Sequence, residues 1–156
     1  MFFPDYSSTT SENYLKDRGL RPTRIRVMVV DILKRQPSAL KPQQIQEALP
    51  QDIDRVTFYR TILNFERHGV VHRVAGDDGH VRYALCRHEH ASSGSLPRSE
   101  DHHPHFLCQR CDRTFCLEEV PIQDPILPVG FRAETVSFFL RGTCADCNPE
   151  KNKDLG

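Results

Sequence analysis

Two Cys-x-x-Cys pairs in the second half of this 156-residue chain constrain its fold more than any other feature. The pairs are Cys108 with Cys111 and Cys144 with Cys147. Two residues between the ligands let both sulfurs of a pair face one metal ion, and four thiolates form a closed tetrahedral zinc site with no position open to a substrate. The 32 residues between the pairs exceed the roughly 15–20 of a compact zinc ribbon. The sequence therefore predicts one structural zinc per chain that ties together two distant segments; the alternative is two redox-active or unrelated thiol pairs.

Composition excludes a membrane protein and divides the chain into two halves of opposite charge. No apolar run reaches the roughly 18 residues that span a bilayer. Residues 1–86 hold 13 Lys or Arg against 10 Asp or Glu, whereas residues 87–156 hold 8 against 11. The first residues lack the basic segment of a secretory signal, so we expect a cytoplasmic protein. Its six cysteines are then thiols rather than a disulfide framework.

The first half carries the pattern of a winged helix-turn-helix. Helical patterns are predicted over residues 7–18, over about 12 residues after an N-cap at Thr23, from Pro42 to Pro50, and from a cap at Asp52 or Asp54 to Gly69. Strand-like runs at residues 70–74 and 80–85 flank the turn signal Gly-Asp-Asp-Gly at residues 76–79. Helices followed by a β-hairpin, in this order, predict a winged-helix domain.

A linker and a smaller second domain are predicted to follow. Residues 92–101 have linker composition, so the boundary falls between Cys86 and His102. The expected organisation is a domain over residues 1–86, a linker over 87–101, a second domain over 102–148 and a flexible tail over 149–156. Strand candidates are residues 103–108, 114–117 and 131–140, and three prolines within residues 120–130 oppose a long helix between them.

A second set of possible metal ligands surrounds the first Cys-x-x-Cys pair. It comprises Cys86, His102, His103, His105 and Cys116, with His72 and His80 on the hairpin. Strand alternation would place His103 and His105 on one face. His72 and Cys86 would bring ligands from the first domain, so a filled site would fix the angle between the domains. Nitrogen with thiolate ligands favours zinc and is compatible with iron, cobalt or nickel. The alternative is a group of solvated histidines and two buried cysteines.

Basic residues in the first half favour contact with DNA. Five lie close together, Lys16, Arg18, Arg21, Arg24 and Arg26, and could contact several phosphates. At the front of the fourth predicted helix stand Arg55, Thr57, Tyr59 and Arg60, side chains that suit base edges and thymine methyl groups. The alternative is that these charges form an ordinary solvated face.

Five segments in order resemble the ferric uptake regulator superfamily, and within it the zinc uptake regulators. They are residues 19–26, 56–60, 83–86, 102–111 and 142–147, so the resemblance spans about residues 12–148. It implies an α+β fold: an N-terminal winged helix-turn-helix followed by a small C-terminal α/β dimerisation domain with structural zinc. The implied function is that of a bacterial homodimeric repressor of metal-uptake genes that binds a palindromic operator in double-stranded DNA. No enzymatic activity, small-molecule substrate or membrane partner is implied.

The resemblance also implies roles for individual residues. Tyr59 and Arg60 would contact the operator, and Arg26 would assist. The regulatory metal site would comprise His72, Cys86, His103 and His105, together with Cys116 at a position where relatives often have Glu. Cys86 favours Zn²⁺ over Fe²⁺ as the regulatory ion, because iron-sensing relatives usually fill this region with Glu and His. Segment 121–130 is short and proline-rich where relatives hold a longer helix, which suggests a different dimer interface.

Three alternative functions remain at this stage. One is an iron- or peroxide-sensing repressor of the same superfamily. Another is a zinc-ribbon interaction module that does not bind DNA. The third, a zinc hydrolase or deaminase, is disfavoured because catalytic zinc needs an open position and a carboxylate base. Glu118 and Glu119 are the obvious candidates for that base, and the chain contains no His-x-Glu or His-Glu-x-x-His pattern.

Overall fold

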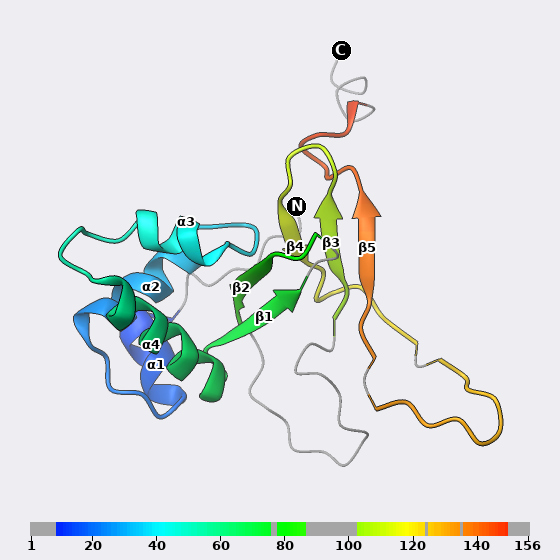
Figure 1. The fold of residues 1–156 in the computed structure, drawn as a ribbon, viewed down its shortest axis with the longest axis horizontal. Coiled ribbons are helices and arrows are strands. Elements are labelled where there is room, and N and C mark those ends of the chain that lie inside the picture. Colours follow the sequence, from blue (N-terminus) through cyan, green and yellow to red (C-terminus); the bar gives the residue numbers. More distant parts are fainter. Residues whose placement is uncertain (1–8, 76–77, 87–102, 124, 135, 150–156) are drawn as a thin grey trace. The chain divides into compact units, whose positions relative to one another are not determined.

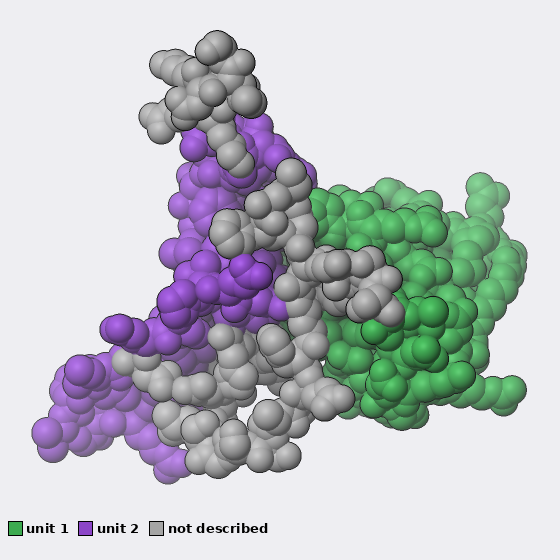
Figure 2. Space-filling view, turned by 180° about the vertical axis from the view of Figure 1, so that it is seen from behind, with its two compact units in different colours: residues 1–91 green, residues 92–156 purple. Residues whose placement is uncertain are grey.

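The chain folds into two units that differ in secondary structure. The computed structural model describes residues 9–75, 78–86, 103–123, 125–134 and 136–149. Unit 1 contains residues 1–91 and unit 2 residues 92–156 (Figure 2). The domain limits proposed from the sequence stay a prediction, and the predicted linker, residues 87–101, lies outside the described residues.

Unit 1 contains four helices followed by a hairpin, as the sequence predicts (Figure 1). The elements are α1 (Ser11–Asp17), α2 (Arg24–Lys34), α3 (Pro42–Glu47), α4 (Arg55–Arg67), β1 (Val71–Ala75) and β2 (Val81–Leu85). The strands pair antiparallel, with Val71 opposite Leu85. Leu40 adds an isolated bridge to β2, because its N–H donates to the carbonyl of Tyr83 at 2.9 Å and its carbonyl accepts from the Tyr83 N–H at 2.8 Å.

Polar caps and glycines set the ends of the helices. The carboxylate of Asp54 accepts a hydrogen bond from the N–H of Thr57 at 2.9 Å, so Asp54, and not Asp52, is the N-cap of α4. Gly19 and Gly69 follow α1 and α4 with φ of 73° and 61°, a left-handed conformation that glycine adopts without steric cost. Thr23 occupies the N-cap position of α2, but its side chain makes no capping hydrogen bond.

The hydrophobic core of unit 1 lies among its helices and hairpin. Phe58, Ile62 and Phe65 on α4 are almost completely buried, as is Ile45 on α3. Apolar residues with helical spacing on α2 also face the core: Val29 and Leu33 are buried, whereas Ile25, Met28 and Ile32 are half-buried. The helical periodicity therefore predicted the inward face of α2 and α4.

Unit 2 contains a three-stranded sheet with the order β4-β3-β5 (Figure 1). The strands are β3 (His105–Cys108), β4 (Thr114–Cys116) and β5 (Phe139–Gly142). Strand β3 pairs antiparallel with β4 and parallel with β5. The described part of unit 2 has no α-helix, in keeping with the prolines in segment 120–130. The two units together confirm the α+β class.

The third strand of unit 2 is much shorter than predicted. Residues 131–140 were expected to form it, but β5 starts at Phe139 and ends at Gly142. The reason is that β3 offers only four positions, and each residue of β5 pairs with one of them. The described residues before β5 that belonged to the predicted strand, 131–134 and 136–138, form no strand. No helix among the described residues is both long and apolar enough to cross a bilayer.

Candidate metal centres and nucleic-acid surface

The four cysteines of the two Cys-x-x-Cys pairs meet at one end of the sheet in unit 2. Because β3 and β5 are parallel, their carboxyl ends lie side by side, with Cys108 opposite Gly142. Cys144 follows Gly142 by two residues, and the N–H of Gln109 donates to the Gly142 carbonyl at 2.8 Å. Parallel pairing therefore closes the 32-residue gap between the two pairs.

The geometry of these four sulfurs fits a tetrahedral metal ion. All four lie within 4.8 Å of one another, and the sulfurs of Cys111 and Cys144 are 3.8 Å apart. Zinc with Zn–S bonds of about 2.3 Å needs an S–S separation of roughly 3.8 Å in a tetrahedron. The structure describes all six cysteines and none forms a disulfide. The donor set therefore fits the structural zinc that the sequence predicts.

The pKa values of three of these thiols shift in different directions, because their hydrogen bonds differ. The pKa of Cys147 is raised to about 12, mainly by hydrogen bonds with Cys144 and Cys111. Desolvation raises the pKa of Cys108, but backbone N–H groups outweigh it and lower that pKa to about 6. The guanidinium of Arg113 lowers the pKa of Cys111. A bound dication would remove the remaining protons, because the thiolate is the metal-binding form.

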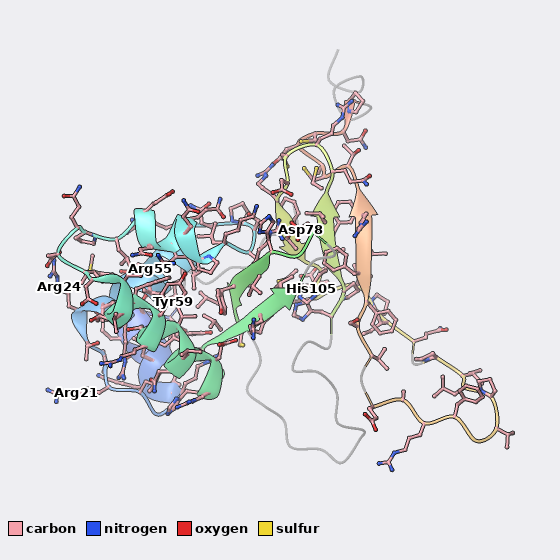
Figure 3. All side chains as sticks on the ribbon, in the orientation of Figure 1. Arg21, Arg24, Arg55, Tyr59, Asp78 and His105 are labelled. Atoms are coloured by element: carbon pink, nitrogen blue, oxygen red, sulfur yellow. The ribbon has the colours of Figure 1, made fainter. Side chains whose placement is uncertain are left out.

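Three of the other predicted ligands, His103, His105 and Cys116, lie on or beside the same sheet. His105 on β3 lies opposite Cys116 on β4 in the antiparallel register. His103 lies two residues before His105, and their ring centroids are 4.8 Å apart, so the two imidazoles share a face as predicted. One ligand atom of each of the three residues lies within 4.8 Å of those of the other two. Burial, followed by the charge of His103, lowers the pKa of His105 (Figure 3) to about 4. His105 is therefore neutral, the form that binds metal, at physiological pH.

Unit 1 contains the other two predicted ligands, His72 and Cys86. His72 is buried on β1, and Cys86 directly follows β2. The sulfur of Cys86 lies 3.6 Å from Nδ1 of His72, because the hairpin brings its two ends together. Sorted by unit, the five predicted regulatory ligands form two groups: His72 and Cys86 belong to unit 1, and His103, His105 and Cys116 belong to unit 2. His80 is exposed at the turn of the hairpin, and His102 lies outside the described residues.

Helix α4 presents the predicted DNA-binding side chains to solvent. Arg55, Thr57, Tyr59 and Arg60 are all exposed. Arg55 and Tyr59 lie one turn apart on α4 (Figure 3), with the guanidinium carbon 5.5 Å from the ring centroid. The hydroxyl of Thr57 donates to the Asp54 carboxylate at 2.5 Å. Thr57 therefore offers mainly its methyl group to a ligand.

Two of the basic residues that the sequence predicts to contact DNA donate hydrogen bonds within unit 1. Arg26 donates to the carbonyl of Arg21 at 2.9 Å and to the side-chain oxygen of Asn64 at 3.3 Å, which joins α2 to α4. Arg18 donates to the carbonyls of Gly69 and Cys86, both at 3.0 Å. These positions hold the helices in place, whereas Arg21, Arg24 and Lys16 stay exposed.

Sequence reasoning missed two apolar residues on the outer face of α4. Val56 and Leu63 are 59% and 53% exposed. They lie seven residues apart, two turns of a helix, and outside the buried positions Phe58, Ile62 and Phe65. The same periodicity that identified the core could have placed them beside Tyr59. The outer face of α4 is therefore partly apolar, as contact with thymine methyl groups requires.

A winged helix with an exposed, basic fourth helix, combined with clusters of cysteine and histidine, defines the class of metal-responsive DNA-binding regulators. Comparison with known proteins agrees. The sequence model of the ferric uptake regulator family matches residues 17–94, half of the chain. The chain belongs to the ferric uptake regulator family. Members of this family are transcription regulators and not enzymes.

Individual relatives extend the similarity over most of the chain. The ferric uptake regulation protein of Bordetella parapertussis is 26% identical over 146 residues, which cover 88% of this chain and 96% of that protein. Two solved structures share the fold, each with a TM-score of 0.58. One, a zinc-bound manganese uptake regulator, is 22% identical and aligns over 87% of this chain and 99% of its own. The other, described as holo XcZur, is 20% identical and aligns over 87% and 92%.

Proposed function

We propose that the chain is a zinc-responsive repressor of metal-uptake genes that acts as a homodimer on a palindromic operator in double-stranded DNA. The observation that carries the choice of zinc is that a cysteine sulfur accompanies imidazole in both groups of regulatory ligands. Cys86 lies beside His72 in unit 1, and Cys116 lies opposite His105 in unit 2. Thiolate with imidazole suits zinc, whereas harder divalent cations favour carboxylate and carbonyl oxygens. Bacterial DNA lies in the cytoplasm, so the proposal assigns a DNA-binding repressor to that compartment.

The proposal gives the two metal centres different tasks. The closed set Cys108, Cys111, Cys144 and Cys147 holds one structural Zn²⁺ per chain, since four thiolates leave no position for exchange with substrate. The regulatory Zn²⁺ is held by ligands drawn from His72, Cys86, His103, His105 and Cys116. Because these belong to both units, a bound ion restricts the orientations that the units adopt.

Regulation then follows from a shift of population. Zinc binds the arrangement that brings both ligand groups to one ion more tightly than any other arrangement, and so increases its share. In a dimer, that arrangement sets the separation of two α4 helices, which must match half-sites about one helical turn of DNA apart. The operator contacts are proposed to come from Arg55, Thr57, Tyr59 and Arg60, with Arg26 holding α2 against α4.

The first test is the zinc content of the purified chain by mass spectrometry, before and after mild chelation. We expect two zinc ions per chain that fall to one, since a closed four-thiolate site resists exchange. Cys86→Ser should weaken zinc-dependent operator binding at least about tenfold and leave the structural zinc in place. His80→Ala is the matched control, because His80 is an exposed imidazole on the same hairpin. Unchanged zinc-dependent binding in Cys86→Ser would refute the assignment of the regulatory site.

A second candidate is an iron-sensing repressor, which the name of the Bordetella parapertussis relative favours. Imidazole ligands accept iron as well as zinc. The two functions separate in one titration: operator binding is measured with Zn²⁺ and with Fe²⁺ under anaerobic conditions. Operator binding with Zn²⁺ and not with Fe²⁺ supports the zinc proposal, and operator binding with Fe²⁺ contradicts it; a lower half-saturation with Zn²⁺ alone would not separate the two, because most sites bind Zn²⁺ more tightly than Fe²⁺. A chain that binds no operator with either ion would instead be an interaction module.

A further inference from the structure

Arg113 reaches both halves of the four-cysteine cluster. It follows the first pair at the end of the turn between β3 and β4, where its carbonyl accepts from the N–H of Cys108 at 2.9 Å. Its side chain donates from Nε to the sulfur of Cys111 at 3.3 Å and from Nη2 to the sulfur of Cys144 at 3.8 Å. One guanidinium therefore contacts one sulfur from each Cys-x-x-Cys pair.

Two further contacts hold the guanidinium in this position. Nη2 donates to the carboxylate of Asp146 at 2.6 Å, and Asp146 lies between Cys144 and Cys147. The guanidinium carbon lies 5.3 Å from the centroid of the Phe115 ring. Arginine suits this place, because its planar fork donates in several fixed directions at once, whereas lysine offers a single ammonium group.

A zinc ion bound by four thiolates carries a net negative charge, which these contacts from Arg113 stabilise. Four thiolates around Zn²⁺ leave two negative charges, and nothing in the ligand set itself offsets them. Charge-assisted hydrogen bonds to the sulfurs stabilise that charge and are roughly twice as strong as neutral ones. They also withdraw electron density from sulfur, so the sulfur attacks an electrophile more slowly. Outer groups of this kind tune a metal site as its ligands do.

We propose that Arg113 is a positioning residue of the four-cysteine centre, which retains zinc and protects the sulfurs from electrophiles through hydrogen bonds to Cys111 and Cys144. This inference rests on the proposed structural zinc. It assigns Arg113 a task that neither the DNA surface nor the regulatory ligands require.

The test follows the loss of zinc from the full-length protein after mild chelation has removed the exchangeable ion. Iodoacetamide is the probe: a thiolate sulfur forms a bond to the methylene carbon, iodide leaves, and the resulting thioether releases Zn²⁺ to a chromogenic chelator. Arg113→Gln should release zinc about tenfold faster than the unmodified chain. Arg113→Lys keeps the charge without the fork, so its rate should lie between the two.

Arg110 supplies the matched control. It lies within the same Cys-x-x-Cys pair and is exposed, and it donates to the backbone carbonyl of Cys147 at 3.2 Å instead of to a sulfur. Arg110→Gln should release zinc at the rate of the unmodified chain. Equal rates for Arg113→Gln and Arg110→Gln would overturn the proposal, because loss of the contact to sulfur would then have no effect beyond that of losing a nearby positive charge.

A second variant covers the case in which Arg113→Gln does not fold. Asp146→Asn leaves the guanidinium in place but weakens its anchor, so we expect a smaller acceleration, about threefold. Thermal unfolding of each zinc-loaded variant identifies any general loss of structure. A chain that holds no zinc tightly would refute both the structural zinc and the role of Arg113. A chain that retains one zinc, with unchanged release rates in Arg113→Gln and Asp146→Asn, would refute only the role of Arg113.

Discussion

A buried arginine holds the turn of the hairpin in unit 1. The side chain of Arg82 is only 1% exposed, and its two terminal nitrogens donate to both carboxylate oxygens of Asp78 at 3.0 and 2.6 Å. A buried charge is tolerated where a partner satisfies it, and removal of that partner leaves the full cost of desolvation. The pair therefore fixes the turn more firmly than a surface ion pair could.

Asp78→Asn should lower the free energy of unfolding by about 1.5–3 kcal/mol, because the buried Arg82 loses its hydrogen bonds to a charged carboxylate. Asp52→Asn is the control, since Asp52 forms a 2.6 Å ion pair with Arg24 in which both side chains are more than half exposed. That variant should cost less than about 1 kcal/mol. Urea unfolding of unit 1 measures both, and equal losses would show that burial of Arg82 contributes nothing.

The same pair predicts a dependence of stability on pH. Hydrogen bonds from Arg82 hold the pKa of Asp78 well below its ordinary value of 3.8. The unfolded chain therefore binds a proton at a higher pH than the folded chain does, and stability decreases as the pH falls. The contribution of Asp78 is complete above about pH 4 and is lost progressively below it. Unfolding curves at pH 3 and pH 6 should differ less in Asp78→Asn than in the unmodified chain.

Among the secondary-structure elements, α1 holds the start and the end of the hairpin together through hydrogen bonds to Val70, just before β1, and Cys86, just after β2. The hydroxyl of Tyr14 lies 2.9 Å from the carbonyl of Val70 and 2.5 Å from that of Cys86, and it donates its single hydrogen to this pair of acceptors. Arg18 stacks on the Tyr14 ring at 3.7 Å and also donates to the Cys86 carbonyl. Helix α1 therefore fixes the backbone of a proposed regulatory ligand, although it supplies no ligand itself.

Tyr14→Phe should destabilise unit 1 by about 1–1.5 kcal/mol, because the buried carbonyls lose their phenolic donor while the ring stays packed. Tyr59→Phe provides the control, since the Tyr59 side chain is exposed on α4; its effect should stay within about 0.5 kcal/mol. Chemical denaturation followed by the helical circular dichroism signal measures both. A Tyr14→Phe variant as stable as the Tyr59→Phe variant would show that the hydrogen bonds of the Tyr14 hydroxyl do not stabilise unit 1.

At the scale of the whole molecule, the two units achieve stability by different means. The hydrophobic core cluster consists of unit 1 residues alone. Among the described residues of unit 2, the buried apolar side chains are Pro104, Leu107, Cys108 and Cys144. Small domains with so little core usually depend on a metal or on disulfides. Unit 2 should therefore fold only when the four-cysteine centre is filled.

Cys111→Ser tests this dependence, because it removes one of the four ligands of the structural zinc. We expect the loss of that zinc and the unfolding of unit 2, while unit 1 keeps its helices. Limited proteolysis should then cut within residues 103–149 and spare residues 9–86, with Cys116→Ser as a control that leaves the four-cysteine set intact. Resistance of both segments to protease would mean that unit 2 folds without its zinc.

Sequence patterns alone predict the four helices, the hairpin, the candidate ligands and the family. These follow from patterns within single segments: the 3.6-residue stripe of α2 and α4, the glycines after α1 and α4, and the Cys-x-x-Cys spacing. The sequence overestimated the strand at residues 131–140, because a strand's length depends on its partner and β3 offers four positions.

Contacts between residues far apart in the sequence, by contrast, are visible only in the folded chain. Parallel pairing of β3 with β5 brings the two cysteine pairs to one end of the sheet. The contact between Arg113 and Asp146 joins residues 33 positions apart, and that between Arg18 and Cys86 joins residues 68 apart. Local periodicity shows which face of a helix or strand is buried, but it does not specify which distant element packs against that face. In the sequence Arg18 belongs to a run of basic residues, whereas in the structure it donates a hydrogen bond to the backbone at the end of the hairpin.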